Sequence, residues 1–121
     1  MVFKLNYGNL RVLFTGDIEL DAEKMLIKLY GNKLNSNILK VAHHGSNSSS
    51  CDEFIKIVNP QIGLVGVGKN NKYGHPSNST IDILNNNNVK LYRTDLNGEI
   101  SIWADKNGIV KIKKCINFLN S

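Results

Sequence analysis

Short segments of the chain carry apolar residues in two patterns that predict β-strands. Some alternate apolar with polar residues, which is the period of a strand with one buried face. Others are almost continuously apolar, as in a central strand; in residues 62–67 (IGLVGV) the glycines also indicate close approach of another layer. The predicted strands are residues 2–6, 10–14, 38–42, 62–67, 89–94, 99–104 and 109–113.

Three segments between these strands predict helices. One places apolar residues at helical spacing and ends at Gly31-Asn32. A second begins at Ser50-Cys51-Asp52-Glu53, which has the Ser-x-x-Glu form of a capping box. The third is expected to be capped by Ser77. The predicted helices are residues 18–30, the segment from the capping box to residue 58, and residues 80–86.

The order of these elements predicts a layered α/β fold. The first two strands pair as a hairpin across residues 7–9, and the middle of the chain alternates strand and helix, which favours right-handed crossovers. The last three strands are expected to form a meander of hairpins. Three helices of this length cover mainly one face of a mixed sheet, so the other face is expected to lack cover.

Composition narrows the class of protein without identifying a partner. With 121 residues and 41% hydrophobic residues, the chain is long enough for one domain with a core. No apolar run approaches the roughly 18–20 residues of a membrane span, and residues 1–9 lack the pattern of a secretory signal. The two cysteines exclude a disulfide scaffold and a thiolate zinc cage. A net charge of +5 fits a polyanionic substrate, and it also fits an ordinary solvated lysine surface.

Four polar residues follow or lie near the ends of predicted strands: Asp17, His43, His44 and His75. If the strands run parallel, these residues converge on one rim of the sheet, where open α/β folds bind ligands. Imidazole and carboxylate together suit Zn²⁺, Mn²⁺ or Fe²⁺. Adjacent side chains of an extended segment diverge, so one of the paired histidines is the candidate ligand and the other a supporting or proton-transfer group.

Each of these candidates also has a structural interpretation. Asp17 precedes a predicted helix and is equally suited to cap it. The paired histidines are also consistent with an idle exposed pair, and Gly-His-Pro around His75 with a plain turn. In the same way, the serines of residues 46–50 suit a phosphate cradle or helix capping, and Asp95 suits the rim or a turn. Tyr73 and Tyr92 suit base stacking or burial at an edge.

Four motifs, taken together, resemble one known family. They are LRVLFTGDIE (residues 10–19), ILKVAHHGS (38–46), VGKNNKYGHPS (67–77) and VKLYRTDLNGEI (89–100). In this order and spacing they resemble the C-terminal half of a metallo-β-lactamase-fold domain, in particular the domain of ComEC-type competence proteins, which internalise DNA. The resemblance extends over residues 2–113.

The resemblance implies an αββα sandwich with a dinuclear zinc or manganese site at one edge. It implies that Asp17 is the bridging carboxylate and that one of the paired histidines, with His44 favoured over His43, is a metal ligand. His43 is then expected near the reacting phosphate, and His75 is expected to face the substrate. The implied activity is metal-dependent hydrolysis of DNA or another phosphodiester. The implied location is the outer face of the cytoplasmic membrane, as part of a larger membrane protein.

The sequence departs from this family in one large respect. The family's His-x-His-x-Asp-His motif is absent from these 121 residues, which contain three histidines. We therefore expect half of the sandwich, weak metal binding and little activity from the chain alone. The uncovered sheet face is expected to bind a missing N-terminal half-domain or a second copy. A non-catalytic DNA-binding α/β module and an esterase of the same fold, acting on another phosphorylated substrate, are alternatives.

Overall fold

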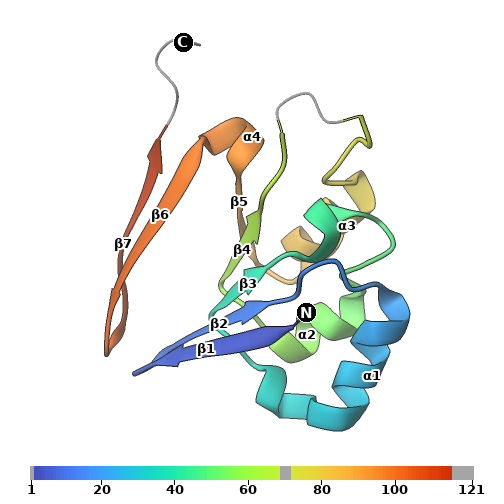
Figure 1. Ribbon diagram of the computed structural model, residues 1–121, viewed down its shortest axis with the longest axis horizontal. Helices are drawn as coiled ribbons and strands as arrows, with labels where there is room; N and C mark the ends of the chain where they lie inside the picture. The colour runs from blue at the N-terminus through green and yellow to red at the C-terminus, as the bar shows by residue number, and fades with distance from the viewer. Residues whose placement is uncertain (1, 69–71, 116–121) are drawn as a thin grey trace.

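The computed structural model describes residues 2–68 and 72–115. It contains a five-stranded sheet with helices on one side and a two-stranded hairpin on the other (Figure 1). The strands are β1 (Phe3–Tyr7), β2 (Leu10–Phe14), β3 (Ile38–Lys40), β4 (Ile62–Val65), β5 (Lys90–Arg93), β6 (Glu99–Asp105) and β7 (Gly108–Cys115). The helices are α1 (Leu20–Tyr30), α2 (Asp52–Val58), α3 (Asn78–Asn86) and the short α4 (Thr94–Asn97), with 3₁₀ turns η1 (Gly31–Leu34) and η2 (Ala42–Gly45).

The five-stranded sheet has the order β1-β2-β3-β4-β5, in which β1 and β2 are antiparallel and all later neighbours are parallel. This confirms the predicted α/β class with a mixed sheet. Because β2 to β5 run parallel, their carboxyl ends lie at one edge of the sheet. The loops after these strands carry the candidate site residues to that edge.

The main core lies between the sheet and the helices. Alternate strand residues such as Leu39 and Val65 pack there against Phe54 and Ile55 of α2 and Leu84 of α3. The strand β4 is closely approached at Gly63, where a β-carbon would lie 3.2 Å from Val89 Cγ1. The neighbouring side chains come from residues in or beside β3 and β5 of the same sheet, so the predicted approach of another layer is wrong at this position.

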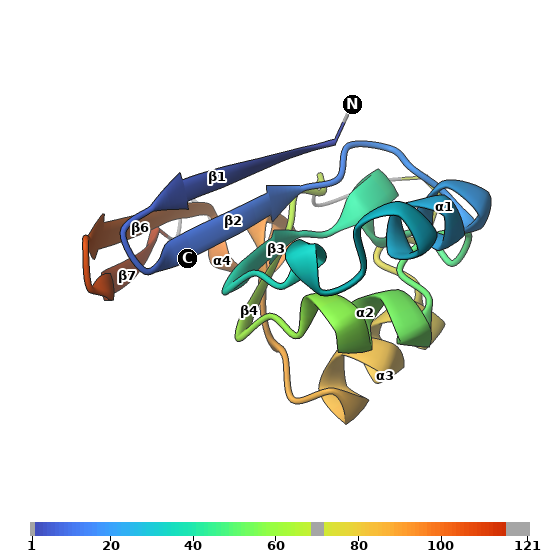
Figure 2. The ribbon, with the colours of Figure 1, turned by 90° about the horizontal axis from the view of Figure 1, so that it is seen from below.

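The other face of the sheet is covered in part by the β6–β7 hairpin (Figure 2). Ile100, Ile102 and Ile112 pack against buried residues that include Ile62 and Tyr92. The predicted meander is wrong between β5 and β6, because α4 lies between them and β6 pairs with β7 in a separate sheet. The helical turn redirects the chain from the edge of one sheet onto its face.

The edge strand β1 keeps an exposed apolar row on the hairpin's face of the sheet. Phe3, Leu5 and Tyr7 are each about half exposed, and the Phe3 ring stacks on Phe14 of β2. The expected lack of cover therefore applies at β1, whereas the centre of this face is covered by the hairpin. In the described ranges, no helix has the length and apolar character needed to cross a membrane.

Candidate functional site

The loops after β2 and β3 meet at the carboxyl edge of the sheet. The backbone N–H of His43 donates a hydrogen bond to the carbonyl of Gly16, at 2.9 Å, beside Asp17. Asp17 is exposed and does not cap α1, whose N-cap is Glu19, so its interpretation as a helix cap is wrong. Burial lowers the pKa of the nearby Lys40, and the Asp17 carboxylate partly opposes this shift. The carboxylate and the ammonium are therefore electrostatically coupled.

The paired histidines have an unusual backbone conformation. His43 and His44 have φ angles of 51° and 53°, so two consecutive non-glycine residues are left-handed. Such residues are uncommon, cost free energy and gather at functional sites. Gly45 follows with φ 81°, and a β-carbon there would lie 2.5 Å from Pro76 Cβ. The glycine thus lets the loop between β4 and α3, which contains Pro76, pack closely against the segment that carries the paired histidines.

His44 is held by a backbone carbonyl. Its Nδ1 lies 2.6 Å from the oxygen of Gly66, in the loop after β4. A carbonyl oxygen can only accept, so Nδ1 carries a proton, and in the neutral form of the ring the lone pair is then on Nε2. A histidine that ligates a metal through one nitrogen usually donates from the other in this way. The hydrogen bond thus fixes the orientation of the His44 ring.

The other two histidines lie in a row of aromatic rings. The His43 and His75 rings meet edge to face at 5.9 Å, and the Tyr73 ring stacks on His75 at 5.7 Å. His43 Nδ1 also lies 3.3 Å from Ser48 Oγ. An adjoining cavity of about 350 Å³ is lined by His44, Gly66, Val67, Gly68, Tyr73, His75 and Thr94.

The structure brings three of the four predicted residues to this cavity or its wall. His44 and His75 line it, and His43 contacts the His75 ring. Asp17 lies on the adjoining loop, with no hydrogen bond or ion pair between its carboxylate and an imidazole of the described chain. Gly66 lies between the cavity that it lines and the Lys40 side chain, because a β-carbon on Gly66 would lie 3.5 Å from Lys40 Nζ. The Lys40 ammonium therefore reaches the rim.

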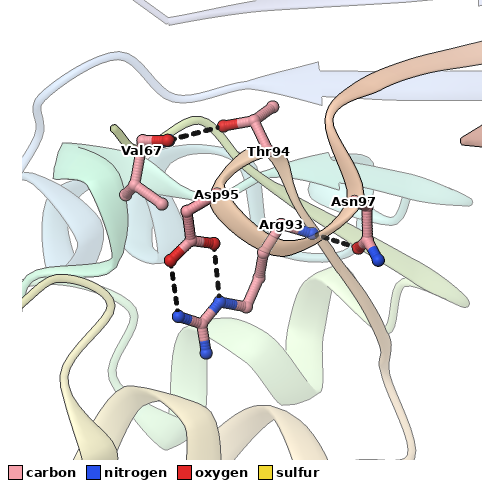
Figure 3. Close-up of polar contacts among 5 residues, drawn as sticks. All are labelled: Val67, Arg93, Thr94, Asp95 and Asn97. Carbon is pink, nitrogen blue, oxygen red and sulfur yellow. Dashed lines mark hydrogen bonds and ion pairs between the residues drawn. The ribbon is translucent and has the colours of Figure 1, made fainter. Parts of the chain in front are cut away.

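Polar contacts hold the turn after β5, where Thr94 lines the cavity (Figure 3). Thr94 Oγ1 accepts from the backbone N–H of Val67 at 2.8 Å and donates to its carbonyl at 2.9 Å. Arg93 donates two hydrogen bonds to Asp95, at 3.0 and 2.7 Å, and this contact raises the arginine pKa. Asp95 is therefore engaged with Arg93, which favours its interpretation as a turn residue.

A buried carboxylate that the sequence analysis missed supports the serine loop. Glu23 of α1 is fully buried and accepts from the backbone N–H groups of Ser50 and Cys51. The predicted capping box is wrong, because Cys51 is the N-cap of α2 and makes no side-chain cap hydrogen bond. The sequence did contain a signal for the buried carboxylate, because Glu23 lies at helical spacing from Leu26 and Ile27 on the buried side of α1. Ser77, by contrast, caps α3 as predicted, accepting from the Thr80 N–H at 3.2 Å.

The described residues do not form a complete metal site. They contain no group of three His, Cys, Asp or Glu side chains close enough to hold an ion. The chemistry of Asp17 and His44 suits Zn²⁺ or Mn²⁺, but two ligands do not close a site of about four.

The two tyrosine candidates for base stacking differ in exposure. Tyr92 is a core residue, 6% exposed, whereas Tyr73 is 76% exposed.

No protein-family model matches the chain. The chain is 34% identical over 100 residues, 83% of its length, to ComE operon protein 3 of Bacillus subtilis. It is 33% identical over 108 residues, 89% of its length, to competence protein ComA of Neisseria gonorrhoeae. It is 26% identical over 101 residues, 84% of its length, to recombination protein 2 of Haemophilus influenzae.

These relatives are much longer than the chain. The aligned part is 13% of the Bacillus protein, 16% of the Neisseria protein and 12% of the Haemophilus protein. The similarity supports a relationship to a family of competence proteins. It concerns a small part of each relative.

Proposed function

We propose that the chain is part of a metal-dependent phosphodiesterase domain of metallo-β-lactamase fold that acts in DNA uptake during competence. In this proposal Asp17 and His44 are metal ligands, for zinc or manganese. His43 and His75 face the reacting phosphodiester. The domain belongs to a larger membrane protein and lies on the outer face of the cytoplasmic membrane.

The hydrogen bond from His44 to the Gly66 carbonyl carries the proposal. It leaves the Nε2 lone pair available on a histidine that is exposed at the rim. An idle surface histidine needs neither a fixed ring nor a left-handed backbone. The adjoining Gly16–His43 hydrogen bond joins the Asp17 loop to the same histidine pair. The competence relatives support the association with DNA uptake.

The proposal assigns the chain part of a site. With two candidate ligands, the described residues do not fit a complete dinuclear centre, so we derive no hydrolytic step from them. The further ligands would come from another segment. The chain's own contribution is to hold the His44 ring, to place the Asp17 carboxylate beside the rim and to present His43 and His75 to the substrate.

Metal binding tests this assignment directly. Equilibrium dialysis of the chain against Zn²⁺ or Mn²⁺, followed by metal analysis, is expected to show weak binding. Asp17→Asn and His44→Ala are each expected to reduce it, whereas His75→Ala is the matched control and is expected to leave it unchanged. Binding that is the same in the His44→Ala variant and the natural chain would refute the ligand assignment.

Activity provides a second test. The chain alone is expected to hydrolyse bis(p-nitrophenyl) phosphate little or not at all. Addition of the homologous preceding segment of a full-length competence relative is expected to raise both the metal content and a chelator-sensitive activity. Robust chelator-sensitive nuclease activity from the 121 residues alone would contradict the proposal of a partial site.

A non-catalytic nucleic-acid-binding module is the second candidate. Its specific support is the outer side of the β6–β7 hairpin, where Lys111 lies 5.1 Å over the half-exposed Trp103 ring. This function predicts salt-dependent DNA binding that survives Asp17→Ala and His44→Ala. An esterase of the same fold, acting on a phosphorylated polymer other than DNA, would instead need both residues and would cleave that polymer in preference to DNA.

A further inference from the structure

Tyr73 combines exposure with a fixed neighbour. It is 76% exposed, although its ring stacks on His75 with centroids 5.7 Å apart and planes 28° apart. The near-parallel contact engages one face of the tyrosine ring. The described residues leave most of the rest of the ring exposed, in contrast to Tyr92, which is buried in the core.

The Tyr73 ring is the last of three aromatic rings in contact, which lead from His43 through His75 to Tyr73. His75, on which Tyr73 stacks, meets His43 at 5.9 Å with the ring planes at 63°. Tyr73 and His75 also line the cavity of about 350 Å³ that contains His44. This volume is within the range of small-ligand pockets, about 300–1,000 Å³. A planar group stacked on the exposed face of Tyr73 would therefore lie near the cavity that contains His44, with the tyrosine ring between it and His75.

We infer that Tyr73 is a base-stacking residue, which holds a nucleobase of single-stranded nucleic acid next to the phosphodiester at the His44 rim. Every nucleobase has a π-face that stacks on an aromatic ring, so this contact needs no particular sequence. The exposed Lys72 beside Tyr73 adds a positive charge for the backbone. A polymer of sugar or polyol phosphates has no π-face to stack on the ring and would offer it only C–H groups. The inference rests on the proposed function and names its substrate class.

Binding to matched oligonucleotides tests the inference. Fluorescence anisotropy compares a labelled oligo(dT) with an abasic oligonucleotide of equal length, with the full chain at fixed low salt and with a chelator to prevent cleavage. Tyr73→Ala is expected to weaken oligo(dT) binding by about 5- to 150-fold, the equivalent of about 1–3 kcal/mol for one stacked base. It is expected to leave abasic binding unchanged.

Two variants serve as controls. Tyr73→Phe keeps the ring and is expected to bind oligo(dT) like the natural chain. Tyr7→Ala removes another exposed tyrosine, 54% exposed on β1, and is expected to have no effect. An equal loss for both oligonucleotides in Tyr73→Ala, or no loss for either, overturns the inference. Equal affinity of the natural chain for the two oligonucleotides also overturns it.

Failure of this inference is distinguishable from failure of the proposed function. The anisotropy assay excludes metal, so it reports on stacking whether or not Asp17 and His44 are ligands. If metal binding proves independent of His44 while Tyr73→Ala still selectively weakens oligo(dT) binding, the stacking role stands and the ligand assignment falls. The reverse pair of results retains the ligands and refutes the stacking role.

Discussion

Replacement of Glu23 by glutamine tests whether a buried carboxylate holds the loop beside His43. The Glu23 side chain accepts from the Cys51 N–H at 3.0 Å and from the Ser50 N–H, and Ser50 has a left-handed φ of 60°. Glutamine has nearly the same shape but one acceptor oxygen, so its amide nitrogen would face one of the two donors. Glu23→Gln therefore leaves a buried N–H group without an acceptor.

The magnitude follows from that one lost acceptor. A buried donor without a partner costs about 1–3 kcal/mol, a large part of the roughly 5–15 kcal/mol by which a domain is stable. With a urea dependence of about 2 kcal/mol/M, a loss of about 2 kcal/mol lowers the urea midpoint by about 1 M. Circular dichroism measures the midpoint. Hydrogen exchange is expected to accelerate in residues 46–50, the loop whose Ser48 contacts His43.

Glu19→Gln is the matched control. Glu19 is exposed, and it is the N-cap of α1 without a side-chain cap hydrogen bond. The same change of charge there is expected to alter stability by less than about 0.5 kcal/mol. Equal midpoints for the Glu23 and Glu19 variants would refute the reasoning, because they would mean that the buried carboxylate does not stabilise the loop.

Three further changes test other parts of the structure. Thr94→Val removes two hydrogen bonds to Val67. At about 0.5–1.5 kcal/mol for each bond, it is expected to cost about 1–3 kcal/mol in urea unfolding, and an unchanged midpoint would contradict this role. Burial lowers the Lys40 pKa below 10.5. The buried ammonium therefore lowers the free energy of unfolding by its full amount at neutral pH, and this effect disappears as the pH rises toward 10.5 and the folded protein loses the proton first. Lys40→Met is therefore expected to be more stable than the natural chain at pH 7, and the gap in urea midpoints is expected to close at high pH; a constant gap would refute this cause. We expect the chain to associate through the exposed apolar row of β1 at tens of micromolar, so light scattering should give a mass above 13.5 kDa. Leu5→Lys places a charge in this row and is expected to restore the mass to 13.5 kDa. Asn6→Lys is the control and is expected to leave the association intact, because the side chain of residue 6 points to the other face of the sheet. A natural chain of 13.5 kDa would exclude this association.

The strands and helices were predictable where local pattern and tertiary packing agree. The continuous apolar run at Ile62–Val65 has buried neighbours on both sides of the sheet, and the Ser77 cap is formed within its own helix. Parallel pairing of β2 to β5 also made the meeting of the histidine loops predictable. The α4 turn was missed because the residues after β5 carry an ordinary turn composition, and the contacts of Thr94 and Arg93 decide its conformation.

The missed features depend on residues that are far apart in the sequence. Glu23 lies 27 and 28 residues before the N–H groups that it accepts from, whereas the capping-box pattern at Ser50 is local and misled the prediction. The left-handed conformation of His43 and His44 has the same origin, because contacts with Gly16 and Gly66 hold the pair. Histidine is enriched among left-handed residues, but a His-His pair does not by itself predict two of them in succession.

That backbone is an argument for function that does not depend on similarity to other proteins. Each left-handed non-glycine residue costs about 1–3 kcal/mol, and His43 and His44 adopt this conformation in succession. A structural turn at this position could use glycine or asparagine at lower cost. Two imidazoles in their place, one held by a carbonyl and the other against His75, favour a site that uses the rings. If so, His43→Gly and His44→Gly should each preserve or raise stability, while His44→Gly reduces the weak metal binding as His44→Ala does. Loss of stability in both variants, with metal binding intact, would instead assign the rings to structure.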